Sequence, residues 1–224
     1  MKGEKHNIAI FNTFKTRRNK FTGEAKRQRG ILAHLAMEQS PELRTRTSIA
    51  HFIAKKHGIL WQNIYSGIFR DLDEVLIPSG VVKEGGRLPL RRGPRALQLE
   101  GVPFYELTEA GLVVASTIEE IDDRLRLLKS YITSMSYTNK DESMMLNGLL
   151  LLVDIAPSFM SKIINEYIYA YTTGLIQSIT PIDMKKFRNA VSNKISVERE
   201  LVEAFANSHP EEQVVIRNFF NVVT

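Results

Sequence analysis

Apolar residues recur at helical spacing in the first part of the chain. Leu32 and Leu35 belong to a pattern that predicts a helix over residues 24–38, because one face of an α-helix repeats about every 3.6 residues. A second helix is predicted over residues 47–58. Gly58 can adopt the left-handed backbone conformation that commonly ends a helix.

A third amphipathic segment follows the second helix after a very short turn. Ile64, Ile68 and Leu72 are spaced by four residues, which predicts a helix over residues 59–75. Two helices joined by a turn that contains glycine form a helix-turn-helix unit, whose second helix can enter the major groove of DNA. The third helix is therefore a candidate recognition helix.

Two short segments after the third helix have the composition of β-strands. Residues 81–84 (VVKE) and 103–108 (PFYELT) are rich in β-branched and aromatic residues. Between them lies a loop with glycines, prolines and four arginines, which are Arg87, Arg91, Arg92 and Arg95. Cations at this density repel one another, so we expect the loop to bind a polyanion. The alternative is a solvated loop that only keeps the protein soluble.

Three helices, a strand, a long loop, a second strand and a further helix occur in the order of a winged helix. The segments TSIAHFIAKKHGILWQNIYSGIFRDL, GVVKEGG and FYELTEAG resemble winged helix-turn-helix transcriptional regulators, in which an aromatic-x-Leu-Thr-x-x-Gly signature closes the wing. The resemblance covers residues 26–130. It implies DNA binding, with the third helix in the major groove and the arginine-rich loop as a wing on the backbone or in the minor groove.

The net charge of +5 is distributed unevenly along the chain. Residues 1–100 contain 19 lysines and arginines against 9 acidic residues, whereas residues 101–224 contain 11 against 16. A basic half of this kind is typical of proteins that bind a polyanion, such as nucleic acid. Residues 1–25 are predicted to form a basic N-terminal arm, which either follows DNA or is disordered without a partner.

Candidate nucleic-acid-binding residues come from the arm, the third helix and the wing. Polar side chains opposite the apolar stripe of the third helix can pair with base edges, although any amphipathic helix carries polar residues on its surface. Cations of the arm and the wing can contact phosphates or the minor groove. The complete set is Lys15, Arg17, Arg18, Lys20, Gln62, Asn63, Ser66, Arg70, Arg87, Arg91, Arg92 and Arg95.

Residues 111–137 are predicted to form one long helix that connects two domains and pairs two subunits. Its apolar residues follow alternate steps of four and three, as in the seam of a coiled coil. They are Val114, Ile118, Ile121, Leu125, Leu128, Ile132 and Met135. Arg124 and Lys129 would repel each other in a parallel pair, so antiparallel pairing of a homodimer is favoured. The alternative is that this stripe packs against the C-terminal helices of its own chain.

Residues 138–224 are predicted to form a C-terminal bundle of four helices. Pro157 separates the first two, and Pro181 and Pro210 open the others, because proline is favoured in the first turn of a helix. Phe159, Ile163, Tyr167, Ile168 and Tyr171 form a broad apolar face. Core packing is the favoured role of these tyrosines, and an effector pocket or an interface is the alternative.

The composition also narrows the possible chemistry. The chain has no cysteine, which excludes disulfides and thiolate metal sites. We expect no membrane insertion, because its longest apolar run is too short to cross a bilayer and its start lacks a secretory signal. Phosphate-binding loops, zinc-binding helices and nucleophile elbows are missing from the sequence. No catalytic residue, metal or cofactor is therefore predicted, and the protein is not expected to be an enzyme.

These patterns predict a mainly α-helical protein with a small β-hairpin wing. The predicted parts are the arm (1–25), a winged helix-turn-helix domain (26–110), a long linker helix (111–137) and a helical domain (138–224). The leading hypothesis is a cytoplasmic, nucleoid-associated dimeric regulator that binds double-stranded DNA. One alternative is a module that binds structured RNA or a ribonucleoprotein through the wing. Another is a protein-interaction scaffold with an acidic partner.

Overall fold

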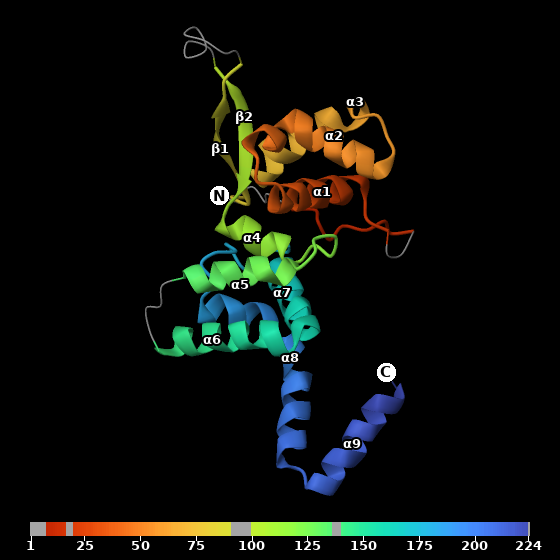
Figure 1. The fold of residues 1–224 in the computed structure, drawn as a ribbon. Helices are drawn as coiled ribbons and strands as arrows, with labels where there is room; N and C mark the ends of the chain where they lie inside the picture. Colours follow the sequence, from red (N-terminus) through yellow and green to blue (C-terminus); the bar gives the residue numbers. More distant parts are fainter. Residues whose placement is uncertain (1–7, 17–19, 91–99, 136–139, 224) are drawn as a thin grey trace.

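The computed structural model describes residues 8–16, 20–90, 100–135 and 140–223. Within these residues the protein is mostly helical, at 67%, with nine α-helices and one two-stranded antiparallel sheet (Figure 1). The predicted mainly helical fold with a small hairpin is confirmed.

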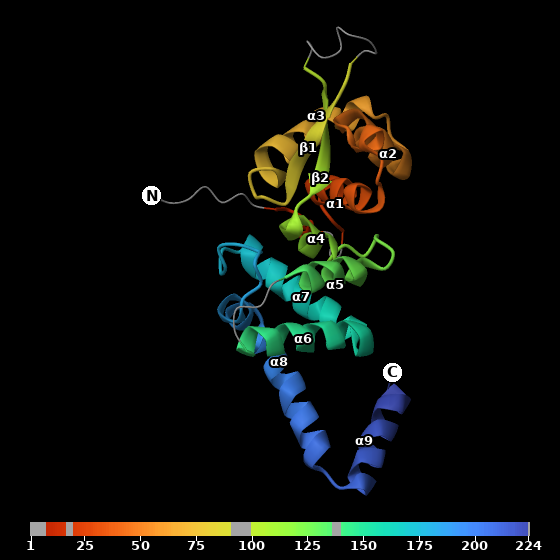
Figure 2. The same ribbon diagram turned by 60° about the vertical axis from the view of Figure 1, so that its left-hand side comes forward.

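The first three helices and the hairpin lie at one end of the molecule (Figures 1 and 2). Gly58 closes α2 in the left-handed conformation, with φ of 64°, as predicted. The elements are α1 (Gly23–Met37), a 3-10 turn (Pro41–Arg44), α2 (Arg46–His57), α3 (Gln62–Arg70), a π-helical turn (Asp71–Leu76), β1 (Val82–Leu88) and β2 (Val102–Leu107). The three predicted helices and the turn between the second and third are therefore confirmed.

The hairpin is longer than the sequence predicts. β1 and β2 pair from Val82 opposite Leu107 to Leu88 opposite Val102, with a bulge at Gly85. Arg87 therefore lies in β1, where the sequence analysis had placed it in the loop. The outer edge of β2 is tied to the start of α2 by an isolated bridge between Thr45 and Phe104.

The Leu-Thr-x-x-Gly signature joins the hairpin to the next helix, α4 (Glu109–Ala115). The Thr108 hydroxyl accepts a hydrogen bond from the Gly111 amide at 3.1 Å and so caps α4. The Thr108 amide donates to the Val81 carbonyl at 3.1 Å. A Cβ on Gly111 would lie 2.2 Å from that same carbonyl oxygen, so only glycine allows this close approach.

The prediction of one continuous helix over residues 111–137 is wrong. α4 ends at Ala115, and α5 begins only at Arg124 and ends at Ser134. The hydroxyls of Ser116 and Thr117 each donate to a backbone carbonyl three residues earlier at 2.7 Å, which competes with continuation of a helix. Asp123 then adopts the left-handed conformation, with φ of 52°, and reverses the chain into α5.

The apolar stripe of this region lies in the core of its own chain. Val114, Ile118, Ile121, Leu128 and Ile132 are at most 5% exposed. Leu125 and Met135, the other two seam positions, are partly buried against the same core. A coiled-coil seam between subunits through these residues is therefore contradicted, and the alternative, packing within the chain, describes the stripe.

The C-terminal part contains the four predicted helices, but only some of them form a bundle. α6 (Lys140–Ile155), α7 (Pro157–Thr172) and the start of α8 (Met184–Asn207) pack with α5. Val191 is the last buried residue, and residues 192–223 are exposed or at most partly buried. The rest of α8 and α9 (Pro210–Val223) form a V that points away from the body (Figures 1 and 2).

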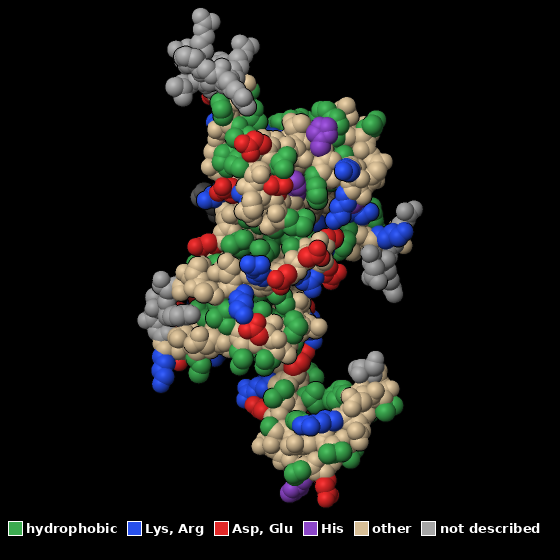
Figure 3. All heavy atoms as spheres, viewed as in Figure 1, with side chains coloured by type: hydrophobic (Ala, Val, Ile, Leu, Met, Phe, Trp, Pro, Cys, Tyr) green, Lys and Arg blue, Asp and Glu red, His purple; other side chains and the backbone are tan. Residues whose placement is uncertain are grey.

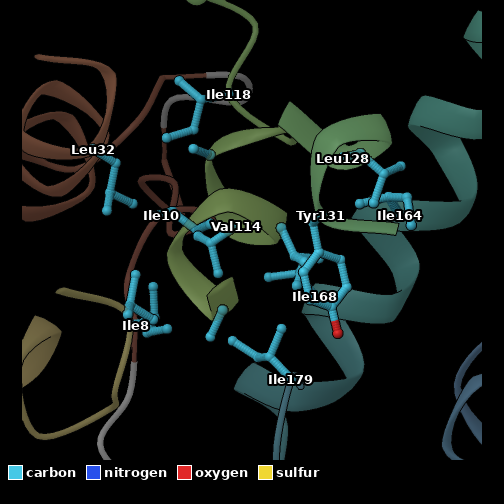
Figure 4. Packing of buried hydrophobic residues seen from close by; sticks show 14 of the residues in the cluster. Ile8, Ile10, Leu32, Val114, Ile118, Leu128, Tyr131, Ile164, Ile168 and Ile179 are labelled. Atoms are coloured by element: carbon cyan, nitrogen blue, oxygen red, sulfur yellow. The ribbon is translucent and has the colours of Figure 1, made fainter. Parts of the chain in front are cut away.

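One cluster of buried residues runs through the body from Ile8 to Val191. Ile8 and Ile10, at 3% and 0% exposure, belong to the same cluster as Leu32 of α1 and Val114 of α4 (Figure 4). The Ala9 amide between them donates to the side-chain carbonyl of Gln28 at 2.7 Å. The prediction of a free arm over residues 1–25 is therefore wrong for residues 8–10, whose apolar side chains are buried.

Candidate nucleic-acid interface

The polar face of α3 is exposed as a set. Gln62, Asn63, Ser66 and Arg70 are all exposed, whereas Ile68 on the opposite side is fully buried. Gln62 and Asn63 are neighbours in the sequence, Ser66 follows Asn63 by three positions and Arg70 follows Ser66 by four, so the four side chains lie on successive turns of one side of the helix. Their exposure agrees with the sequence-based grouping, and their contact with bases stays a prediction.

A buried ion pair fixes the end of α3 against α1. The guanidinium of Arg27 donates to the carboxylate of Asp71 at 2.7 Å, and the Asp71 side chain is fully buried. The Arg27 side chain crosses Gly67, where an added Cβ would lie 2.7 Å from the Arg27 Nε. Breaking a buried pair of this kind leaves an uncompensated charge, so the position of α3 is strongly held.

A second arginine ties α3 to α2 and to the hairpin. Arg46 of α2 forms an ion pair with Asp73, and its guanidinium lies 4.0 Å from the ring centre of Phe69 and 5.4 Å from that of Tyr105. Burial raises the pKa of Tyr105, so this ring stays a neutral phenol beside the cation. α2, α3 and β2 therefore meet at one arginine and keep a fixed relative position.

Aromatic rings brace the inner side of α3. Trp61 contacts His51 at 4.8 Å and Tyr65 at 5.4 Å between ring centroids, and Tyr65 contacts Phe69 at 4.8 Å. Trp61 and Tyr65 are partly buried against the core. Both rings therefore help to hold α3 against the body.

The hairpin carries one of the four predicted wing arginines within the described residues. Arg87 donates to Glu84 at 2.8 Å and to Glu100 at 3.3 Å. The hydrogen bond that Arg87 donates to Glu84 raises the pKa of Arg87, and the two carboxylates offset its charge. Arg91, Arg92 and Arg95 lie outside the described residues, as do Arg17 and Arg18 of the predicted arm.

Lys15 and Lys20 are exposed on a loop that is held against α1. Phe14 donates from its amide to the Lys20 carbonyl at 2.9 Å, and Arg29 stacks over Phe21 at 4.2 Å. In Figures 1 and 2 this segment and α3 lie on different sides of α1. The structure therefore does not bring these two lysines together with the polar face of α3.

Lys55 at the end of α2 is a further candidate residue that the sequence-based set does not include. Lys55 is exposed and lies one helical turn after His51, which contacts Trp61 at the start of α3. The signal was present as two lysines and a histidine at residues 55–57, a pattern that also stabilises the C-terminal end of a helix dipole. Lys56 lies about 100° further round the helix than Lys55, and its charge contributes to lowering the pKa of Glu120.

Many cations of the basic half are neutralised within the chain. Arg29 pairs with Glu120, and its Nε donates to one Glu120 oxygen at 3.1 Å. Burial opposes ionisation of Glu120, but the bonds and charge of Arg29 outweigh it and lower the pKa of that carboxyl. Arg44 pairs with Glu106 at 3.6 Å. The excess of basic residues over 1–100 therefore overstates the free positive charge.

Membrane-spanning helices, metal sites and similarity to known proteins are further features that bear on function. No described helix combines the length and apolar character needed to cross a membrane. No group of three or more histidines and carboxylates suited to a metal ion occurs among the described side chains. Comparisons with family models, curated proteins and solved structures find no match for this chain. Its function must therefore be argued from its own geometry.

Proposed function

We propose that this protein binds double-stranded DNA through a winged helix-turn-helix unit formed by α1, α2, α3 and the hairpin. α3 enters the major groove, and the hairpin lies on the adjacent backbone or minor groove. The observation that carries this proposal is the exposed polar face of α3, which Arg27 and Arg46 hold rigidly beside a projecting hairpin.

Each residue on that face has a chemical role in the proposal. Gln62 and Asn63 can pair with the two hydrogen-bonding groups of adenine, and Arg70 can pair with guanine or contact a phosphate. Ser66 can bond to either kind of group. Lys55, next to the start of α3, adds a phosphate contact.

The wing contributes charge through its tip. Since Arg87 is already paired with Glu84 and Glu100, its guanidinium releases few counterions when DNA binds. Arg91, Arg92 and Arg95 are expected to supply the phosphate contacts, which makes the affinity steeply dependent on salt.

A salt series separates this function from its alternatives. The full chain is titrated with fluorescent duplex DNA, duplex RNA and an acidic protein. The triple variant Arg91→Ala, Arg92→Ala, Arg95→Ala is expected to reduce the slope of log K against log salt by about 2 to 3. Arg87→Ala is the matched control, and its slope is expected to change by less than about 1. Equal affinity for duplex RNA favours the RNA alternative, and binding only to the acidic protein favours the scaffold.

The contribution of α3 is tested by selection of bound sequences from a random duplex pool. Replacing Gln62 and Asn63 by alanine is expected to relax the sequence preference more than it lowers nonspecific affinity. Uniform weakening of all sequences would mean that α3 does not read bases. Lys55→Ala is expected to weaken every sequence alike, and Lys56→Ala, which lies on the Glu120 side, is its control.

A further inference from the structure

The C-terminal arm, defined here as residues 192–223, exposes more apolar surface than a monomer normally presents. Val197, Val202, Val215, Phe219 and Val222 are between 59% and 85% exposed. With Leu201, Val214, Phe220 and Val223 they make nine large apolar side chains that are at least 41% exposed. Monomeric proteins rarely expose contiguous apolar patches larger than a few hundred Å².

The arm has a built elbow. The side-chain amide of Gln213 donates to the Phe205 carbonyl at 3.0 Å and to the Ser208 carbonyl at 3.2 Å. Arg217 stacks over the Phe205 ring at 5.5 Å. Glu212 accepts a hydrogen bond from the His209 amide at 2.8 Å, which caps the start of α9. These contacts set the angle between α8 and α9.

Apolar side chains line the inner faces of the V. Phe205 and Arg217 meet in its corner, so residues one helical turn away on each helix point into the same space. These residues are Leu201 on α8 and Phe220 on α9, which are 46% and 41% exposed. Further apolar side chains of the arm are visible on the face shown in Figure 3, where the arm stands apart from the body.

We propose that the arm binds the arm of a second copy of this chain, with the two pairs of helices packed antiparallel about a two-fold axis. A standard interface uses about 20–30 residues of each partner, which residues 192–223 can supply. A two-fold interface uses the same surface on both copies, so one arm supplies both halves.

The charges of α8 and α9 fit an antiparallel copy. The start of α8 has two exposed cations, Lys185 and Arg188, whereas Lys186 is paired with Asp183. The arm carries five acidic residues against three basic ones. Antiparallel pairing brings Glu211 and Glu212 of one copy towards the basic start of α8 in the other. Helices that lie on membrane surfaces are instead rich in lysine and arginine, so a lipid surface is the poorer partner.

This interface is independent of the proposed DNA binding, since it lies at the opposite end of the molecule from α3 (Figure 1). If both proposals hold, one dimer carries two recognition helices and requires two half-sites. The arm would then form the contact between two subunits that the sequence predicts for residues 114–135.

Light scattering on the full chain without nucleic acid tests this inference. The unaltered protein is expected to have twice the mass of the 25.5 kDa chain. The double variant Val202→Glu, Phe219→Glu is expected to weaken the dimer at least about 100-fold, because it places carboxylates in an apolar interface. Both side chains are exposed in the single chain, so circular dichroism of this variant is expected to keep its helical signal.

Leu151→Glu with Ile155→Glu is the matched control. These residues of α6 are 59% and 67% exposed, and this variant is expected to remain a dimer. A single-chain mass for the unaltered protein at about 100 µM would overturn the inference. It would also be overturned by a persistent dimer in the arm variant, by dissociation of the α6 variant alone, or by a monomer that binds anionic lipid vesicles.

Discussion

The stripe at residues 114–135 and the C-terminal arm are both amphipathic, yet they end in opposite environments. The stripe has the more regular spacing, and five of its seven apolar positions are buried in the core of its own chain. The arm has a less regular pattern, and its apolar side chains stay exposed. Periodicity therefore identifies which face of a helix is apolar, but it does not identify what covers that face.

The difference arises because residues interrupt the helix in the stripe but not in α8. Ser116, Thr117 and Asp123 break the stripe into two short elements that fold back onto the body. α8 runs on without interruption for 24 residues, which carries it about 36 Å from its start. A straight helix of that length extends beyond the core against which it begins. The body of the chain therefore does not cover the apolar side chains of its far half.

The largest expected effect distinguishes a buried leucine of the stripe, Leu128, from a partly buried one, Leu125. Leu128→Ala is expected to lower the free energy of unfolding by about 3 kcal/mol, because it leaves a cavity in the core. Leu125→Ala, three residues earlier and partly buried, is expected to lower it by about 1 kcal/mol. Urea denaturation followed by circular dichroism measures both values.

Leu125→Ala also tests whether the stripe or the arm forms the contact between two copies of the chain. A coiled-coil seam would use both leucines, so Leu125→Ala would then lower the mass measured by light scattering. We expect its mass to be that of the unaltered protein. Val222→Ala in the arm, at 85% exposure, is expected to change the stability of the diluted, monomeric protein by less than about 0.5 kcal/mol.

A smaller effect is expected at the junction between the hairpin and the stripe. Gly111→Ala places a Cβ 2.2 Å from the Val81 carbonyl oxygen, so β1 and α4 must move apart. We expect a loss of about 2 kcal/mol in the free energy of unfolding. Gly148→Ala on α6 is the control, since nothing described lies within 4 Å of its added Cβ, and it is expected to stabilise slightly. Equal effects of the two variants would contradict this account.

Local elements were predictable from the sequence because their signals are local. The helices around Leu35, Ile53 and Ile68 follow from spacing, and Gly58 follows from its position after α2. The exposed face with Gln62 and Arg70 followed from the same spacing.

Long-range pairings could not be predicted in this way. Arg27 pairs with Asp71, which lies 44 positions away in the sequence, and Arg29 pairs with Glu120, which lies 91 positions away. A count of charges along the sequence therefore treats both arginines as unpaired cations. Burial of Ile8 and Ile10 likewise depends on α1 and α4, which lie far along the chain. The sequence therefore overstated the basic character of the first half and the length of its free arm.

A smaller effect than that of Gly111→Ala is expected at Tyr167, near the point where the body ends and the arm begins. Its hydroxyl donates to the Ile179 carbonyl at 2.7 Å, and its ring contacts Phe187 of α8 at 5.7 Å. Burial raises the pKa of Tyr167 above the ordinary value of 10.0. As the pH rises above about 10, the unfolded chain releases this proton first, so stability falls with pH until the folded pKa is reached.

Tyr167→Phe removes both the hydrogen bond and the titrating group. We expect a loss of about 1 kcal/mol at pH 7 and a shallower decline of stability above pH 10. Tyr105, Tyr131 and Tyr171, whose pKa values burial also raises, are left to titrate. Tyr169→Phe, on the same helix but 52% exposed, is expected to keep the stability at pH 7 and the original decline. Urea midpoints between pH 7 and 11 measure the stability of both variants. If stability declines with pH in Tyr167→Phe as it does in the unaltered protein, titration of the Tyr167 phenol does not cause that decline.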